Sequence, residues 1–145
     1  MQYVRSIEYT IGKWLFRKKI IIIYGPRQVG KTTTSKSILK KYGNAKNYYD
    51  CEITNVRQAL EKQNPLELLK IFGKEKIIVL DEAQKIPNIG LVLKIFIDTY
   101  PQVQIIATGS SSFDLSNKIN EPLTGRALEF ILYPLSLTEL TQKYN

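Results

Sequence analysis

The sequence predicts an α/β fold in which a mainly parallel β-sheet is covered by helices on both faces, giving three layers. The segments with strand character are apolar throughout instead of alternating, as in residues 20–24 (IIIIY) and 77–80 (IIVL), which is typical of strands buried on both faces. These segments alternate along the chain with segments of helical periodicity, an order that produces a parallel sheet. The chain has 145 residues, the size of one domain with its own core. We therefore expect residues 1–145 to form a single domain.

The residue types present exclude several classes of site. The chain has no histidine and a single cysteine, which excludes His-dependent triads, zinc sites of the usual Cys/His type and internal disulfides. We expect Cys51 to be a small buried hydrophobic residue. The longest uncharged apolar run, residues 20–24, is too short to span a bilayer, and charges interrupt every apolar stretch of residues 1–19. We therefore expect a cytoplasmic protein without a membrane partner.

The first third of the chain predicts a helix, a strand, a loop and a second helix. A helix is expected over residues 3–17, weakened but not ended by Gly12, because apolar residues recur there every three or four positions: Val4, Ile7, Ile11, Trp14 and Leu15. The apolar run 20–24 is the first strand. After a glycine-containing loop, the second helix is expected over residues 31–42, ended by Gly43.

The middle of the chain is expected to supply a second strand and two short helices. Residues 45–52 (AKNYYDCE) form the strand. Residues 54–63 (TNVRQALEKQ) begin the first short helix, with Thr54 or Asn55 as its cap, and residues 65–72 form the second, opened by proline.

Three strands and one helix complete the predicted fold. The strands lie within residues 75–84 (EKIIVLDEAQ), 103–112 (VQIIATGSSS) and 127–136 (ALEFILYPLS). The helix spans residues 88–100 and is so apolar that we expect it to be buried on more than one side or to meet a partner.

The loop after the first strand has the pattern of a phosphate-binding loop. Residues 25–32 (GPRQVGKT) fit G-x-x-x-x-G-K-[ST], in which backbone N–H groups wrap a β-phosphate and the next helix directs its free amides at the same group. Lys31 is expected to reach the β/γ oxygens, and the Thr32 hydroxyl to bind Mg²⁺. A glycine-rich structural turn is the weaker alternative. The predicted nucleotide-binding residues are Gly25, Pro26, Arg27, Gln28, Val29, Gly30, Lys31, Thr32 and Thr33.

Two acids follow the third predicted strand. Asp81 and Glu82 emerge at its carboxyl end, where open α/β sheets bind ligands. We expect Asp81 to hold Mg²⁺, and Glu82 to accept a proton from the attacking water or to orient it. The alternative is that both acids cap the following turn.

Three further residues are candidates for a catalytic role. Thr108 or Ser110, at the end of the fourth predicted strand, is expected to bond the γ-phosphate or the attacking water, and the sequence does not choose between them. Arg126, before the fifth strand, is a candidate arginine finger acting in its own chain or a neighbour's. The equally strong alternative for Arg126 is a pair with Glu121 or Glu129.

The positive charge is concentrated in the first third of the chain. Residues 1–50 hold 11 Lys and Arg against two acids, whereas residues 51–145 hold 10 against 11. Such a surplus suits a nucleic-acid contact, but a solvated helix face beside a site for a polyanionic nucleotide explains it as well, and we favour the latter. The aromatic residues nearby fall mostly at helix positions expected to pack: Tyr3, Tyr9, Trp14 and Phe16.

Taken in order, the stretches GPRQVGKTT, VLDEAQKIP, IIATGSSS and LTGRALEFILYPLSLTEL resemble those of AAA+-like P-loop ATPases of bacteria and archaea. In that family an N-terminal ATPase module precedes a separate C-terminal domain. The resemblance covers residues 5–140 and implies a five-stranded sheet of order 5-1-4-3-2, ATP with Mg²⁺ as cofactors, and Walker A, Walker B and sensor roles at the residues named above. It also implies that this chain lacks the helical lid and the C-terminal domain.

Three functions are therefore predicted, in order of preference. The first is Mg²⁺-dependent ATP binding with slow hydrolysis. The second is a nucleotide-controlled switch without significant turnover, and the third is nucleic-acid binding through the basic first third. ATP is the expected partner, and a second copy, another protein or DNA stay open as further partners.

Overall fold

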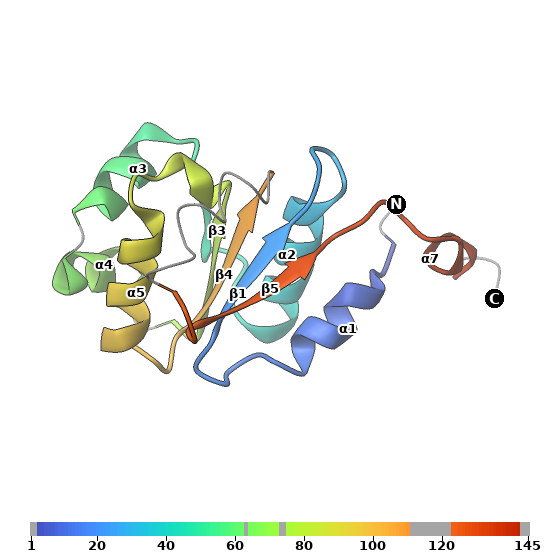
Figure 1. Ribbon diagram of the computed structural model, residues 1–145, viewed down its shortest axis with the longest axis horizontal. Helices are drawn as coiled ribbons and strands as arrows, with labels where there is room; N and C mark the ends of the chain where they lie inside the picture. Colours follow the sequence, from blue (N-terminus) through green and yellow to red (C-terminus); the bar gives the residue numbers. More distant parts are fainter. Residues whose placement is uncertain (1–2, 63, 73–74, 111–122, 143–145) are drawn as a thin grey trace.

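Five parallel strands form one sheet in the order β2-β3-β4-β1-β5 (Figure 1). This computed structural model describes residues 3–62, 64–72, 75–110 and 123–142. Read from the other edge, the order is the predicted 5-1-4-3-2, so the fold class and the strand order are confirmed. The strands are β1 (Ile20–Tyr24), β2 (Tyr48–Asp50), β3 (Ile77–Asp81), β4 (Gln104–Gly109) and β5 (Ala127–Ile131).

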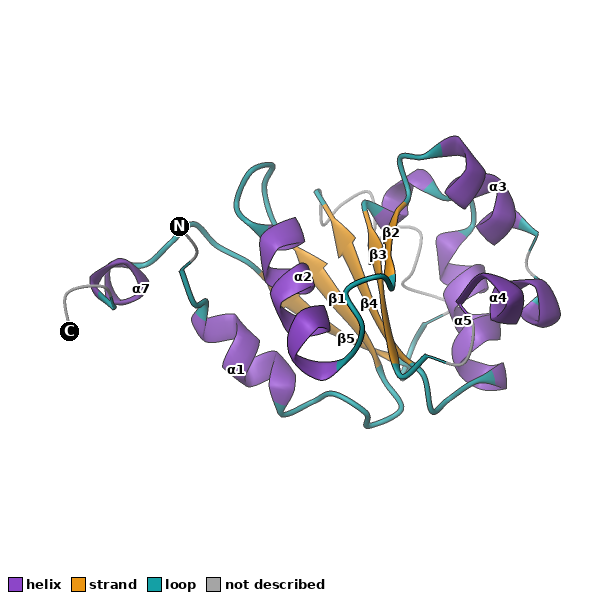
Figure 2. Ribbon diagram, turned by 180° about the vertical axis from the view of Figure 1, so that it is seen from behind, coloured by secondary structure: helices purple, strands orange, loops and turns teal. Residues whose placement is uncertain are grey.

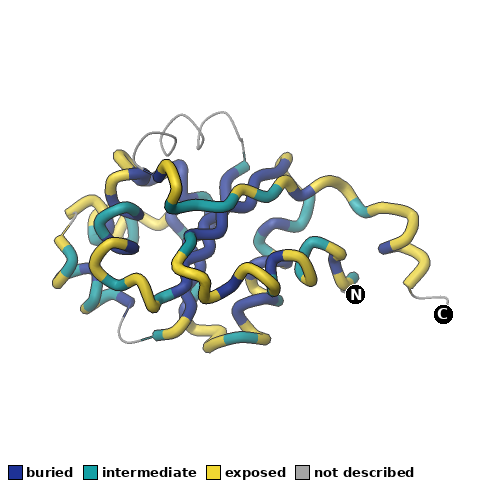
Figure 3. Tube along the Cα trace, turned by 60° about the horizontal axis from the view of Figure 1, so that its bottom comes forward, coloured by how far each residue is buried: buried dark blue, intermediate teal, exposed yellow. Residues whose placement is uncertain are grey.

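Helices cover both faces of this sheet, which gives the predicted three layers. In Figures 1 and 2, α1 and α2 lie on one side of the sheet and α3, α4 and α5 on the other. The last helix, α7, extends from the end of the body next to the N-terminus, and most of it is exposed (Figure 3). The helices are α1 (Ser6–Gly12), α2 (Lys31–Tyr42), α3 (Thr54–Glu61), α4 (Pro65–Phe72), the 3₁₀ turn η1 (Ala83–Lys85), α5 (Ile89–Thr99) and α7 (Leu137–Thr141).

The four consecutive isoleucines of β1 explain why the strand lies in the middle of the sheet. Successive side chains of a strand point to opposite faces. Ile20 and Ile22 accordingly pack in the cluster beneath α3, α4 and α5, whereas Ile21 and Ile23 pack in the cluster beneath α1 and α2. Each is at most 1% exposed, so each contributes about 1.5–3 kcal/mol of burial free energy. The strand therefore has a core on both sides, and the loop that follows it starts from a rigid position.

The helix predicted over residues 3–17 is wrong in its second half, because α1 ends at Gly12. The next residues form turns in which Phe16 and Lys18 have φ values of 60° and 59°, which no α-helix allows. Tertiary hydrogen bonds hold this turn: the Phe16 N–H donates to Gln104 Oε1 at 2.8 Å, and Gln104 Nε2 donates to the Lys19 carbonyl at 2.9 Å.

Three aromatic side chains in and after α1 are exposed. Tyr9, Trp14 and Phe16 are 73%, 42% and 47% exposed. The expectation that these aromatic side chains pack into the body was therefore wrong. Ile11 and Leu15, which lie between them in the sequence, are buried in the cluster beneath α1 and α2.

Two helix ends differ from the prediction in their chemistry. Ile53, not Thr54 or Asn55, caps α3 without a side-chain hydrogen bond. Gly43 ends α2 as predicted, but in extended backbone with φ of −158°. Glycine is required there because a Cβ would lie 2.2 Å from Cγ2 of buried Ile77.

The apolar helix α5 is buried as predicted. Its side chains at Val92, Leu93 and Phe96 are at most 1% exposed, and the Phe96 ring meets the Phe72 ring of α4 edge-on, with 5.1 Å between centroids. Cys51 is fully buried in the same cluster, as expected. Among the described residues, no helix has the length and apolar character needed to cross a membrane.

Candidate nucleotide-binding site

The loop between β1 and α2 needs its two glycines for different reasons. A Cβ on Gly25 would lie 2.6 Å from the Leu132 carbonyl oxygen and 2.9 Å from Val29 Cγ1, so this glycine allows the close approach of the chain that follows β5. Gly30 has a left-handed backbone with φ of 104° and caps the N-terminus of α2, a conformation that glycine adopts without strain. The loop therefore delivers the chain from a buried strand directly into a helix N-terminus.

A cavity of about 330 Å³ lies against this loop. It is lined by Arg27, Gln28, Gly30, Lys31, Thr32, Thr33 and Glu82. The first turn of α2 contains no acidic residue, so the positive end of the helix dipole is not neutralised there. Among the described residues, the cavity is thus lined by the cations Arg27 and Lys31, by the first turn of α2 and by one carboxylate, that of Glu82.

Lys31, the first residue of α2, lies folded against the loop. Its Nζ donates hydrogen bonds to the carbonyl oxygens of Gly25 and Pro26, both at 2.7 Å. Burial lowers the pKa of Lys31, against the opposing effect of the nearby carboxylates of Glu82 and Asp81. The lysine is only 5% exposed and borders the cavity, so its ammonium group is desolvated and close to any anion that enters.

Thr32 and Asp81 meet directly, although 49 positions separate them in the sequence. Thr32 Oγ1 donates to Asp81 Oδ2 at 2.7 Å. Asp81 is the last residue of β3, so its carboxylate lies at the carboxyl edge of the sheet, next to the first turn of α2. Two hard oxygen groups are therefore in contact beside the cavity, which Thr32 lines. Hard oxygens are the donors that Mg²⁺ prefers.

Two hydroxyl groups hold the Asp81 carboxylate from neighbouring strands. Thr108 of β4 donates to Oδ1, and the Tyr48 hydroxyl of β2 donates to Oδ2. Burial of Tyr48 and its hydrogen bond to Asp81 raise the pKa of the Tyr48 phenol above its ordinary value. Thr108 also accepts the backbone N–H of Glu82 at 3.2 Å, so it fixes both acids rather than facing the cavity.

Glu82 has a left-handed backbone with φ of 54°, which is uncommon for a residue other than glycine and is concentrated at functional sites. The chain turns at this residue, and Glu82 lines the cavity, whereas Asp81 does not. Its carboxylate accepts a hydrogen bond from Gln84 Nε2, which also donates to Ser110 Oγ at 3.0 Å. Ser110 is half-buried, whereas Thr108 is fully buried. Of the two candidates for contacting the γ-phosphate, Ser110 is therefore the more accessible to solvent.

Arg126 lies at the amino ends of the strands, opposite to the loop. Its carbonyl accepts the N–H of Ile20, the first residue of β1, whereas the loop follows the last residue of β1. The guanidinium forms an exposed ion pair with Asp98 at 2.9 Å, not with Glu129; Glu121 lies outside the described residues. In this structure Arg126 is therefore not part of the site in its own chain.

Sequence reasoning missed Tyr48 and Gln84. Gln84 follows Glu82 by two positions in DEAQ, and a 3₁₀ turn after the strand brings its amide back onto the acid. The paired register of Asp50 with Asp81 places Tyr48 beside β3, but the sequence does not tell which face of β2 its ring occupies.

Comparisons with known proteins agree with this geometry. A family model described as an AAA domain matches residues 17–141. An uncharacterized protein of Mycobacterium bovis is 34% identical over 123 residues, and one of Methanocaldococcus jannaschii is 32% identical over 133 residues. These matches cover 84% and 85% of the chain but 26% and 28% of the relatives, so the chain spans little more than a quarter of their length.

Solved structures show the same fold. The Walker-type ATPase PABY2304 of Pyrococcus abyssi superposes with a TM-score of 0.69 at 19% identity, over 97% of this chain and 56% of that chain. At this identity the likeness establishes the fold, which is that of P-loop NTPases.

Proposed function

Because the chain belongs to the AAA domain family and has the P-loop NTPase fold, we propose that it binds ATP with Mg²⁺ and hydrolyses it slowly. The observation that carries this proposal is the hydrogen bond between Thr32 and Asp81 beside the loop cavity. A structural turn explains the glycines, but it does not require a lysine, a threonine and an aspartate to meet at a helix N-terminus. A site for a metal-bound polyphosphate does.

In the proposed complex, the amides of the loop and of the first turn of α2 bind the phosphates. Lys31 exchanges its two carbonyl contacts for β- and γ-phosphate oxygens, which costs little because its donors stay satisfied. Thr32 and Asp81 are the residues that would hold Mg²⁺, and they fit it because both offer hard oxygens in contact with each other. The metal, when bound, supplies neutralisation of the charge on the phosphate oxygens.

We assign the proton transfer to Glu82. Its carboxylate lines the cavity and is the acid not committed to Thr32, so it is available to orient the attacking water and accept its proton. In the state described here Gln84 holds it, so hydrolysis requires that contact to loosen. Thr108 acts by holding Asp81, and the half-buried Ser110, joined to Glu82 through Gln84, is our candidate for sensing the γ-phosphate. Arg126 has a role only if a neighbouring copy brings its own loop to it.

The test is a calorimetric titration with ATP, ADP and GTP, each with and without Mg²⁺, followed by phosphate release from the same sample. Lys31→Ala should abolish ATP binding, whereas the exposed Lys40→Ala, on the same helix, should bind as the parent does. Glu82→Gln should bind ATP normally and release phosphate about 10²–10⁴ times more slowly. A Glu82→Gln protein with the parental rate would refute the assignment of the base. Tight binding with no phosphate release would instead favour a nucleotide-controlled switch.

One observation favours nucleic-acid binding as a second function. Helix α1 and the turn after it present exposed aromatic rings together with cations: Lys13 Nζ lies 4.4 Å from the centroid of the Tyr9 ring, and the Arg17 guanidinium 5.3 Å from that of Trp14. Phe16, two residues after Trp14, is also exposed. Rings of this kind stack on single-stranded bases, while Lys and Arg contact phosphates.

This second function predicts binding of a single-stranded DNA oligonucleotide that needs no ATP and weakens steeply between 50 and 200 mM salt. Fluorescence anisotropy would measure it. Trp14→Ala should weaken binding severalfold, whereas Tyr133→Ala, which removes a more exposed ring elsewhere, should not. Equal affinity of the parent and Trp14→Ala proteins would reject this surface.

A further inference from the structure

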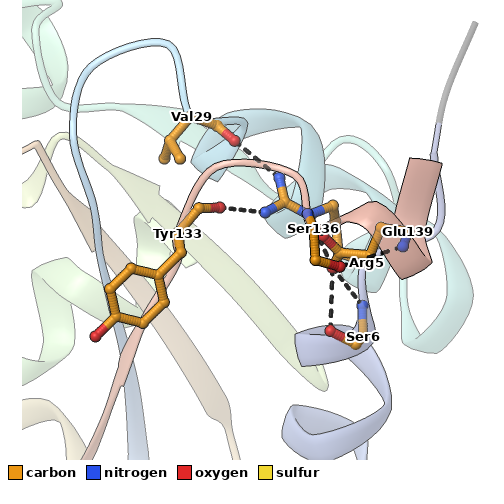
Figure 4. A network of polar contacts seen from close by, with 6 residues as sticks. All are labelled: Arg5, Ser6, Val29, Tyr133, Ser136 and Glu139. Carbon is orange, nitrogen blue, oxygen red and sulfur yellow. Dashed lines mark hydrogen bonds and ion pairs between the residues drawn. The ribbon is translucent and has the colours of Figure 1, made fainter.

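Arg5 is a buried cation that the proposed mechanism does not use. It is 7% exposed and lies where the N-terminal segment, the phosphate loop and the chain after β5 meet (Figure 4). Its Nη1 donates to the Val29 carbonyl of the loop at 2.8 Å, its Nη2 donates to the Tyr133 carbonyl, and its Nε pairs with Glu139 at 3.2 Å. All three donor nitrogens therefore have acceptors, one in the loop itself.

Glu139 anchors this arginine from α7. Its carboxylate accepts hydrogen bonds from the Ser6 N–H at 2.9 Å, the Ser6 hydroxyl at 3.0 Å and the Ser136 N–H at 2.9 Å, as Figure 4 shows in part. Burial acts to raise the pKa of Glu139, but the hydrogen bonds from Ser136 and Ser6 and the charge of Arg5 outweigh it and lower the pKa to about 2. The carboxylate is thus charged and is held by three hydrogen bonds besides its pair with Arg5, which fixes the position of the acceptor for the guanidinium Nε.

The contact with Val29 fixes one peptide unit of the loop. The described residues contain no cis peptide bond, and in a trans peptide the carbonyl and the N–H point in opposite directions. With the Val29 carbonyl turned toward Arg5, the N–H of Gly30 must point to the other side. Gly30 lines the loop cavity and also a second cavity of about 210 Å³ that Arg5 borders, so this peptide forms the wall between them.

Arg5 acts on the loop without reaching the site. It borders the second cavity but not the loop cavity among the described residues, so it is not placed as a phosphate ligand. The peptide it holds precedes Gly30, whose φ is 104° and which can rotate to other backbone conformations because it has no Cβ. If this peptide turned over, a carbonyl oxygen would replace an N–H at the cavity wall and would repel an anion there.

We propose that Arg5, held by Glu139, is a positioning residue that keeps the Val29–Gly30 peptide turned so that its N–H faces the bound phosphate. The inference rests on the proposed nucleotide site, because it assigns a function to the orientation of that amide. It also connects α7 to the site, because a substitution of Glu139 would alter the position of Arg5, which contacts the loop directly.

The test uses inorganic tripolyphosphate, which probes the loop without a base or ribose. Calorimetric titration of the parent, Arg5→Met and Arg5→Lys proteins should show binding about tenfold or more weaker in both variants. Lysine keeps the charge, but its single nitrogen cannot replace the three separate donor nitrogens of the planar guanidinium. Arg57→Met is the matched control: Arg57 also donates to a backbone carbonyl, that of Glu52, and its loss should leave the affinity unchanged. Glu139→Gln should fall between the parent and Arg5→Met.

Amide hydrogen exchange of Gly30 in the free protein, followed by NMR, reads the peptide orientation without any ligand. We expect the Gly30 exchange rate to change in Arg5→Lys and Arg5→Met but not in Arg57→Met. Folded Arg5 variants with parental affinity and parental Gly30 exchange would overturn the inference, and Glu139→Gln and Arg5→Lys provide the same comparison if Arg5→Met does not fold. A parent protein that binds neither tripolyphosphate nor MgATP would refute the proposed function instead, while the exchange comparison would still decide on Arg5.

Discussion

Substitution of Glu139 by glutamine should remove a specific part of the stability of this protein in acid. The carboxyl has a pKa of about 2 in the folded chain against an ordinary value of 4.5. Because folding lowers the pKa, the charged carboxylate stabilises the fold fully above pH 4.5, and this stabilisation is lost as the pH falls through 2. At roughly 1.4 kcal/mol per pKa unit, the carboxylate contributes about 3 kcal/mol to the free energy of unfolding at neutral pH. About 2.5 kcal/mol of this contribution should be lost when the pH is lowered to about 2.5.

The measurement is urea unfolding of the parent and Glu139→Gln proteins at a series of pH values from 7 to 2.5. At pH 7 the variant should be less stable by about 3 kcal/mol, since glutamine brings an N–H₂ group toward the donors of Ser6, Ser136 and Arg5. The two stability curves should then converge as the pH falls. Glu67→Gln is the control, because Glu67 forms an exposed pair with Lys70 that contributes at most about 0.5 kcal/mol. Parallel curves for the parent and Glu139→Gln proteins would refute the reasoning.

Three further substitutions or reactions test other parts of the structure. Gly43→Ala should cost about 1–3 kcal/mol of thermal or urea stability, because the new Cβ meets buried Ile77 at 2.2 Å, and it should leave MgATP affinity unchanged in calorimetry. Thr108→Val should cost about 1–3 kcal/mol by leaving an acceptor of Asp81 without its donor, and it should raise the Mg²⁺ concentration needed for ATP binding; an unchanged Mg²⁺ requirement would argue against the support given to Asp81. Burial raises the pKa of the Cys51 thiol to about 12, so Cys51 should react with a thiol reagent at pH 8 only at the rate of unfolding, and a fast reaction in the native protein would contradict its burial.

The loop after β1 and the sheet were predictable because their signals are local. An apolar strand, two glycines at fixed spacing and a lysine at a helix start are read within twelve residues, 20–31. The side chains of Asp81 and Glu82 were placed by one further rule, that parallel strands end at the same edge. These features depend on residues that are close together in the sequence and on the direction of the strands.

The parts that were missed depend on contacts between distant segments. The periodicity over residues 3–17 favoured a continuous helix, but the side chain of Gln104, 88 positions beyond Phe16, holds the chain in a turn instead. Arg5 and Glu139 are 134 positions apart, and each alone is an ordinary charged residue near a helix N-terminus. Arg126 precedes β5, so it lies at the amino ends of the parallel strands, whereas the loop follows the carboxyl end of β1. The direction of the predicted strands was enough to show this.

The most direct test of the nucleotide site is a crystal structure grown with a non-hydrolysable ATP analogue and Mg²⁺. We expect the triphosphate to lie in the cavity lined by Gly30 and Thr32, with Lys31 released from the carbonyls of Gly25 and Pro26 and turned to the phosphates. Crystals in which this cavity is empty at saturating analogue, or in which Lys31 keeps both carbonyl contacts while the nucleotide binds elsewhere, would contradict it.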